Sequence, residues 1–155
     1  GVMIDADENI KVLEFNCRFG DPETQPIMMR LRSDLAELCL KACKQELSDE
    51  ELDWDIRKSL GVVMASGGYP FDYEKGHNIE GINEESEDLK VFHAGTTYEG
   101  GNVKSNGGRV LCITALGESV SSAQKKAYDA ISNITWKDCF YRNDIGYRAI
   151  EREKN

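Results

Sequence analysis

The feature that most constrains the fold of this chain is a series of short β-rich runs between residues 59 and 115, punctuated by glycine. The runs lie at 59–66, 90–97 and 107–115. Short apolar runs bounded by glycine are typical of strands joined by turns. The sequence therefore predicts a small β-rich domain in the second part of the chain.

One amphipathic helix is predicted after these runs. Ser121, followed three residues later by Gln124, has the spacing of a capping box at the start of a helix. Apolar residues then recur at helical steps, namely Val120, Ala123, Ala127, Ala130, Ile131 and Ile134. We interpret 136–150 as turns, a short strand and a last helical turn, and the acidic stretch 84–88 as a solvated loop.

The residues before this domain predict a β-hairpin and then one helix. Two β-rich runs flank a polar cluster within the first 16 residues, which favours a hairpin. Asp21 as N-cap and Pro22 at the first helical position suit a helix start, and an apolar stripe continues to about residue 46. The acidic run 47–55 is interpreted as a linker. The predicted class is α+β, with domains at 1–51 and 52–155.

Charge and hydropathy exclude some partners. The chain has 155 residues and a formal net charge of -9, without a block of basic residues, so we expect no nucleic-acid partner. No apolar stretch approaches the ~18 residues of a membrane span, and the first residues lack the pattern of a signal peptide. We expect a cytoplasmic protein without a membrane partner. Because the sequence starts without Met inside a strand-like run, we interpret it as a fragment.

The cysteines do not predict a metal site. There are five, at Cys17, Cys39, Cys43, Cys112 and Cys139, with no CxxC pair and only two histidines in the chain. An odd number of cysteines without metal-ligand spacing favours free, buried thiols.

The densest chemical pattern begins in the second run of the hairpin. Side chains alternate along a strand, so Glu14 and Asn16 are predicted to share one face, and Arg18 joins them if the strand persists. A carboxylate and an amide oxygen suit a hard cation such as Mg²⁺, and an arginine beside them can bind a phosphate or carboxylate. The alternative is an edge strand with polar residues facing water, followed by a capped helix.

A second candidate is the run from Asn106 to Arg109. Gly107 and Gly108 allow the backbone to approach an anion closely, and Arg109 can bind a phosphate with two N–H groups. The alternative is a tight turn that leads into the strand at 110–115.

These segments resemble a known family. The run from Glu14 to Gln25, with Pro26, Ile27 and Met28, closely resembles the signature of the phosphoribosylamine-glycine ligases, also called glycinamide ribonucleotide synthetases. These are ATP-grasp enzymes of purine biosynthesis. The resemblance continues in order through 59–65, 67–70, 91–96, 106–111 and 144–150, so it covers essentially the whole chain. A long block with five downstream blocks is far more specific than one short motif.

The resemblance implies a fold and an activity. The chain would hold the end of an ATP-grasp domain, a hairpin plus helix, followed by a small β-rich C-terminal domain with one or two helices. The family joins glycine to 5-phosphoribosylamine while ATP becomes ADP and phosphate, and related ligases proceed through an acyl phosphate, here glycyl phosphate. Mg²⁺ or Mn²⁺ between the phosphate oxygens is the implied cofactor.

The resemblance also implies roles for individual residues. Glu14 and Asn16 match the family's metal ligands, and Arg18 falls where a basic group lies near the transferred phosphoryl group. Asp21 and Glu23 are candidates for positioning the glycine ammonium or Arg18, with helix capping as the alternative. The run from Asn106 to Arg109 resembles the Gly-Arg element that related enzymes use near the ribose phosphate, and this role is carried over to Arg109 alone. Gly107 and Gly108 are the remaining substrate-binding candidates.

Two other interpretations remain open. One is a different ATP-grasp ligase or carboxylase, although the continuation Phe19 to Glu23 argues against it. The other is a non-enzymatic domain that binds partner chains through an exposed surface. Because the nucleotide cleft would lie outside this sequence, we expect the 155-residue chain alone to be inactive.

Overall fold

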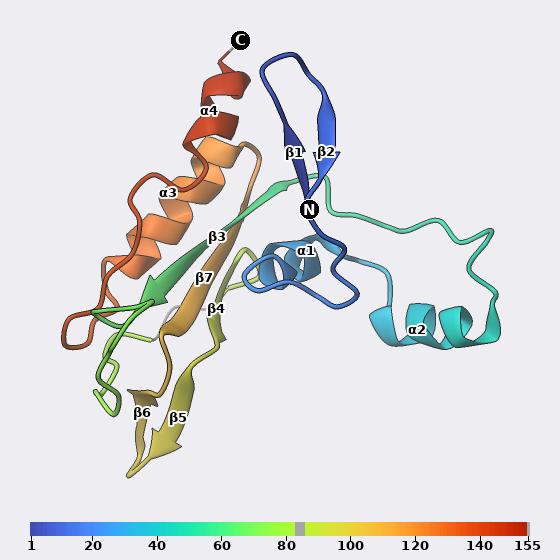
Figure 1. Cartoon of the computed structure of the whole chain (residues 1–155). Coiled ribbons are helices and arrows are strands. Elements are labelled where there is room, and N and C mark those ends of the chain that lie inside the picture. Colours follow the sequence, from blue (N-terminus) through green and yellow to red (C-terminus); the bar gives the residue numbers. More distant parts are fainter. Residues whose placement is uncertain (83–85, 155) are drawn as a thin grey trace.

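The computed structural model describes residues 1–82 and 86–154 and is built around one antiparallel sheet (Figure 1). Its strands are β3 (Lys58–Ala65), β7 (Arg109–Gly117) and β4 (Leu89–His93), with β7 in the centre. The predicted α+β class, a small domain with several strands and a few helices, is confirmed. Residues 84 and 85 of the predicted acidic loop lie outside the described residues.

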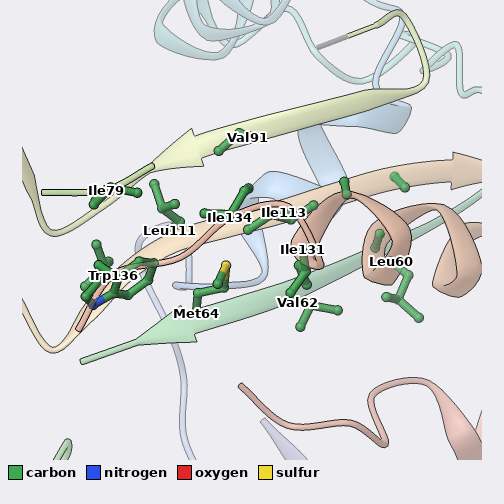
Figure 2. Close-up of a cluster of buried hydrophobic side chains, with 14 of the residues drawn as sticks. Leu60, Val62, Met64, Ile79, Val91, Leu111, Ile113, Ile131, Ile134 and Trp136 are labelled. Carbon is green, nitrogen blue, oxygen red and sulfur yellow. The ribbon is translucent and has the colours of Figure 1, made fainter. Parts of the chain in front are cut away.

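Helix α3 (Val120–Ile131) covers one face of the sheet and creates the hydrophobic core. Leu60, Val62 and Met64 alternate along β3 and point toward this helix, as Figure 2 shows. Ile113 of β7 and Ile131 of α3 meet them there and are almost completely buried. From Leu60 to Met64, every second side chain of β3 is apolar and faces α3, and the apolar stripe of α3 faces β3 in turn. The core therefore lies between the sheet and this helix.

The start of α3 differs from the prediction. The N-cap is Ser119, whose side chain accepts a hydrogen bond from the Ser122 N–H, while the Ser122 hydroxyl accepts one from the Ser119 N–H. The predicted box between Ser121 and Gln124 is wrong because Ser121 already lies within the first helical turn. Gln124 instead donates to the carbonyl of Ile145, which ties the C-terminal segment to α3.

Two smaller elements complete this half. Strands β5 (Thr96–Glu99) and β6 (Asn102–Ser105) form a hairpin around two glycines with positive φ. Helix α4 (Tyr147–Glu153) is longer than the single turn expected from the sequence. No helix within 1–82 and 86–154 is long and apolar enough to cross a membrane.

The N-terminal hairpin is confirmed, although it is shorter than predicted. Strands β1 (Val2–Ile4) and β2 (Ile10–Val12) pair antiparallel, and the Asp5 carboxylate accepts hydrogen bonds from the backbone of the turn. The predicted second run continued to residue 16, but β2 ends at Val12.

The single helix expected up to residue 46 is wrong. The structure has two helices there, α1 (Thr24–Arg30) and α2 (Leu35–Lys44). Leu31 between them is extended and forms a β-bridge with Trp54. The helical spacing of Ile27, Leu31, Leu35 and Leu38 continues across this break, so periodicity alone does not reveal it.

Helix α1 packs on the face of the sheet opposite α3. Gly61 of β3 permits this contact, because a Cβ there would lie 3.1 Å from Cγ of Pro26. Segment 53–55, predicted as linker, pairs with the end of α1, where the Arg30 guanidinium donates to the Asp55 carbonyl. The domain boundary after residue 51 stays a prediction.

The cysteines are free, as expected, but most are not buried. Cys112 is buried and Cys139 is half-buried, whereas Cys17, Cys39 and Cys43 are exposed. The expectation of five buried thiols is therefore wrong, because α2 and the loop after β2 pack against too little of the chain.

Candidate functional site

Glu14 and Asn16 come together as expected, but for a different reason. The Asn16 side-chain amide donates to Oε1 of Glu14 at 3.1 Å, and the Glu14 carbonyl accepts a hydrogen bond from the nitrogen of Gly1 at 2.8 Å. Since β2 ends at Val12, strand alternation does not place them; a direct side-chain hydrogen bond does.

The pair offers oxygen atoms that fit a hard cation. Both side chains are exposed, and the amide contact occupies one carboxylate oxygen of Glu14, which leaves Oε2 and the amide oxygen of Asn16 as donors. Across 1–82 and 86–154 no group of three or more His, Cys, Asp or Glu side chains could hold a metal. The two residues therefore fit part of a coordination shell.

Arg18 stands apart from this pair. Its guanidinium donates to the backbone carbonyl of Phe19 at 2.9 Å, and the described residues give it no ion pair with Asp21 or Glu23. The strand alternation expected to align Arg18 with Glu14 and Asn16 does not extend this far. Arg18 is thus an exposed cation beside the loop, and no carboxylate within 1–82 and 86–154 pairs with it.

Neither Asp21 nor Glu23 caps the helix with its side chain. The N-cap of α1 is Glu23, which makes no capping hydrogen bond, so the predicted cap at Asp21 and first helical position at Pro22 are wrong. The Glu23 carboxylate lies against Gly20, where a Cβ would be 2.7 Å from Glu23 Cδ. The carboxylate of Asp21 is directed elsewhere.

Asp21 is bound by Arg109, which joins two parts of the sequence 88 residues apart. Arg109 Nη2 lies 3.2 Å from Oδ2 of Asp21, and Nη1 donates to the Asp21 carbonyl at 2.7 Å. Helix α1 brings the Asp21 loop onto the sheet, and β7 begins at Arg109 on the same face. The loop that carries Asp21 and the start of β7, which the sequence offered as separate candidates, are therefore in direct contact.

Gly107 and Gly108 form the tight turn before β7. Their carbonyls accept hydrogen bonds from the hydroxyl and the N–H of Ser66. A Cβ on Gly107 would lie 2.8 Å from Cα of Gly95, and one on Gly108 would clash with the Tyr69 ring. Close packing thus accounts for both glycines, while an anion-binding role for them stays a prediction.

A cavity of about 240 Å³ lies between the Asp21 loop and the sheet. Its floor is the β3 face that carries Gly61, Val63 and Ala65, and its rim carries Pro22, Tyr69, Arg109 and Arg142 among others. The floor is apolar and two guanidinium groups border it, which suits a ligand with an anionic group and a less polar body.

Arg142 was not singled out by the sequence analysis. It binds Asp144 through Nε at 2.9 Å and Nη2 at 2.7 Å, and these bonds and the positive charge lower the pKa of Asp144. Tyr69, also missed, lies in the glycine-rich block at 67–70 that carried part of the resemblance. No local pattern indicates either residue, because the cavity assembles from separate segments.

Comparison with known proteins identifies the family. Residues 59–148, more than half of the chain, match the family described as "Phosphoribosylglycinamide synthetase, C domain". The chain belongs to this family. The matched range of this synthetase C domain includes the candidate residues Gly107, Gly108 and Arg109. The candidates from Glu14 to Glu23 lie before it.

Longer relatives match both parts. Phosphoribosylamine-glycine ligase from Escherichia coli O157:H7 is 61% identical over 157 residues, which is 100% of this chain and 37% of that protein. The ligase from Vibrio vulnificus strain YJ016 is 59% identical over 99% of the chain and 36% of that protein. The crystal structure of the ligase from Thermotoga maritima superimposes with a TM-score of 0.76 at 32% identity, covering 93% of this chain and 35% of the other. The chain thus spans a little over a third of the relatives that it matches.

Proposed function

We propose that this chain supplies part of the active site of an ATP-dependent ligase that joins glycine to 5-phosphoribosylamine. The observation that carries the proposal is the 61% identity to a curated ligase over the whole chain, which includes every candidate residue. The ligase would be an ATP-grasp enzyme of purine biosynthesis that acts in the cytoplasm, with glycine, 5-phosphoribosylamine and ATP as its partners.

The proposed reaction has two steps. An oxygen of the glycine carboxylate attacks the γ-phosphorus of ATP, which gives glycyl phosphate and ADP. The neutral amine of 5-phosphoribosylamine then attacks the carbonyl carbon, so that the C–N bond forms, the C–O bond to phosphate breaks and the amine loses a proton. Because the amine is nucleophilic when neutral, the site needs charge stabilisation more than a general base.

Glu14 and Asn16 would hold the cofactor of the first step. A bound Mg²⁺ or Mn²⁺ neutralises charge on the phosphate oxygens. Their mutual hydrogen bond orients both groups before a cation arrives, and both are open to solvent and ligand. Arg18, without a carboxylate partner among the described residues, would stabilise charge on the transferred phosphoryl group.

Arg109 would bind the phosphate of 5-phosphoribosylamine. It lies at the rim of the 240 Å³ cavity, where Gly107 and Gly108 keep the neighbouring backbone free of side chains. A guanidinium binds phosphate with paired N–H donors, and the apolar floor would carry the sugar. Asp21 and Glu23 come from the facing loop.

The proposal is tested in a full-length ligase that carries this sequence. Glu14→Gln and Asn16→Leu should each lower kcat by about 100-fold or more and raise the Mg²⁺ concentration for half-maximal activity, since the first removes the negative charge beside the metal and the second removes an oxygen ligand. Glu46→Gln, on an exposed residue beyond α2, is the matched control and should leave both values unchanged. Wild-type kinetics in Glu14→Gln and Asn16→Leu would remove the two residues from the metal site.

A further inference from the structure

The contact between Asp21 and Arg109 has a specific geometry. The Asp21 carbonyl accepts a hydrogen bond from Nη1 of the guanidinium at 2.7 Å, and the Asp21 carboxylate forms an ion pair with Nη2 at 3.2 Å. A guanidinium has five N–H groups in one plane, so these contacts occupy its Nη1–Nη2 end and leave the edge formed by Nε and Nη2. That free edge can bind two oxygens of a phosphate side by side.

We propose that Asp21 is a positioning residue that holds Arg109 in the orientation that receives the substrate phosphate. The inference rests on the proposed function, because it deepens the role of Arg109 there. A free arginine side chain has many rotamers, and fixing it when the ligand binds lowers affinity. Asp21 fixes the guanidinium beforehand and leaves one edge open.

Stability does not explain this contact. The side chains of Arg109 and Asp21 are 38% and 48% exposed, so water screens their attraction. Exposed ion pairs of this kind contribute little to folding. Asp21 also makes no helix cap, which was the structural role expected from the sequence.

The surroundings of the cavity support the same role. On the same rim, the Asp144 carboxylate accepts hydrogen bonds from Nε and Nη2 of Arg142, while the Asp21 carboxylate forms an ion pair with Arg109. Both arginines on the rim of this cavity are therefore oriented by a carboxylate. Pro22, the neighbour of Asp21, lines the same cavity, so the loop that carries Asp21 forms part of the cavity wall.

Asp21 also lies on the loop that follows Glu14, Asn16 and Arg18. A phosphate bound by Arg109 would therefore be held relative to the loop that carries the proposed metal ligands. Loss of Asp21 would loosen the phosphate end of the substrate while leaving the groups that handle ATP in place.

The test uses a full-length ligase that carries this sequence, with the variants Asp21→Ala, Asp21→Asn, Arg109→Ala and Asp21→Ala/Arg109→Ala. We expect Asp21→Ala to raise the KM for 5-phosphoribosylamine about tenfold and Asp21→Asn about threefold, with kcat changed less than about twofold. The KM values for glycine and ATP should stay constant. Asp49→Ala, on an exposed residue, is the control.

The double variant decides whether Asp21 acts through Arg109. If it does, Asp21→Ala adds nothing to the KM of Arg109→Ala, because the group it positions is gone. Equal, additive effects of Asp21→Ala in both backgrounds would overturn the inference, as would an unchanged KM in either single alanine variant. A Tm that falls in step with the rise in KM would indicate a structural role and would also overturn it.

These outcomes separate the inference from the proposed function. Glycine-dependent ligation by the unmodified enzyme, and its loss in Glu14→Gln, test the function itself. The KM pattern of the Asp21 and Arg109 variants tests positioning alone, in an enzyme already shown to be active.

Discussion

The N-terminal hairpin and helices bury their apolar side chains very differently from the sheet and α3. No residue of β1, β2, α1 or α2 is buried, whereas the sheet and α3 share one continuous core. Phe15 is 87% exposed and Leu111 is 0% exposed. Because an isolated two-stranded hairpin is marginally stable in water, the first region depends on contacts beyond its own strands, while the second supplies its own.

The exposed apolar surface of the first region has the character of an interface. It includes Val2, Met3, Ile4, Ile10, Val12, Leu13, Phe15 and Phe19. Apolar side chains left exposed in such numbers mark places where other protein packs. Since the matching ligases are almost three times as long as this chain, we expect the surface to be covered in a full-length enzyme.

Thiol labelling should show the largest difference between the regions. Cys39 and Cys43 on α2 are exposed, whereas Cys112 in β7 is buried and its thiol pKa is raised by burial. We expect the first two to react with a neutral-pH thiol reagent on the order of 1,000 times faster than Cys112, which must wait for the sheet to open. Similar rates, followed by mass spectrometry of labelled peptides, would contradict the comparison.

Core truncation should separate the regions next most strongly. Leu111→Ala leaves a cavity beneath α3 and should lower the free energy of unfolding by about 2–5 kcal/mol. The same change at Leu13, which is 62% exposed, should lower it by about 0.5 kcal/mol or less. Urea denaturation followed by fluorescence measures both, and equal losses would show that the hairpin shares the core.

Removal of helix caps should have a smaller effect on the free energy of unfolding, and only in the region of the sheet and α3. Ser119→Ala removes the cap of α3 and should lower the global free energy of unfolding by about 1 kcal/mol. Asp34 caps α2 through the N–H groups of Ala36 and Glu37, but α2 has no buried residue. Asp34→Ala should therefore speed amide exchange within α2 and leave the global transition unchanged. A global loss with Asp34→Ala would mean that α2 is coupled to the sheet.

The smallest effect is expected from acid. Arg57 bonds both Asp55 and Asp88, and Lys126 of α3 also bonds Asp88; these contacts lower the pKa of both carboxyls from an ordinary 3.8. A lowered pKa means that the stabilisation is present above about pH 4 and is lost as the pH falls further.

Asp88→Asn should lower the Tm of the sheet domain by about 3 °C or less at pH 7 and reduce its fall between pH 4 and pH 2. Asp49→Asn, which changes an exposed carboxyl, should alter neither value. Calorimetry across this pH range measures both, and parallel pH profiles for Asp88→Asn and the unmodified chain would refute the role of the network.

Local patterns predicted most of the elements because each one has its own signal. The hairpin, the strands of the sheet and the stripe of α3 follow from alternation, glycine punctuation and helical spacing. The break at Leu31 was missed because it depends on the bridge to Trp54, which is 23 residues away in the chain. The capping box was displaced by two residues because three serines, at 119, 121 and 122, lie close together and offer several choices of N-cap.

The candidate site was predicted as residues and not as an arrangement. Glu14 and Asn16 were paired correctly, but by a strand that ends before them. Asp21 was expected to cap a helix or to position the glycine ammonium or Arg18, but in the structure its carboxylate forms an ion pair with Arg109. The two residues are 88 positions apart, so their contact depends on how α1 docks on the sheet. Neither the sequence around Asp21 nor the sequence around Arg109 indicates it.

The glycine-bounded β-rich runs determined by themselves that the second part of this protein would be a small β-rich α+β unit, because strand and helix periodicities are local properties of the chain. The signature at residues 14–25 and the blocks that follow it likewise indicated the family from order and spacing alone. Tertiary structure decided which carboxylate holds which arginine. That choice depends on the two faces of one sheet, with α3 on one side and α1 on the other, since packing brings together groups that the sequence keeps far apart.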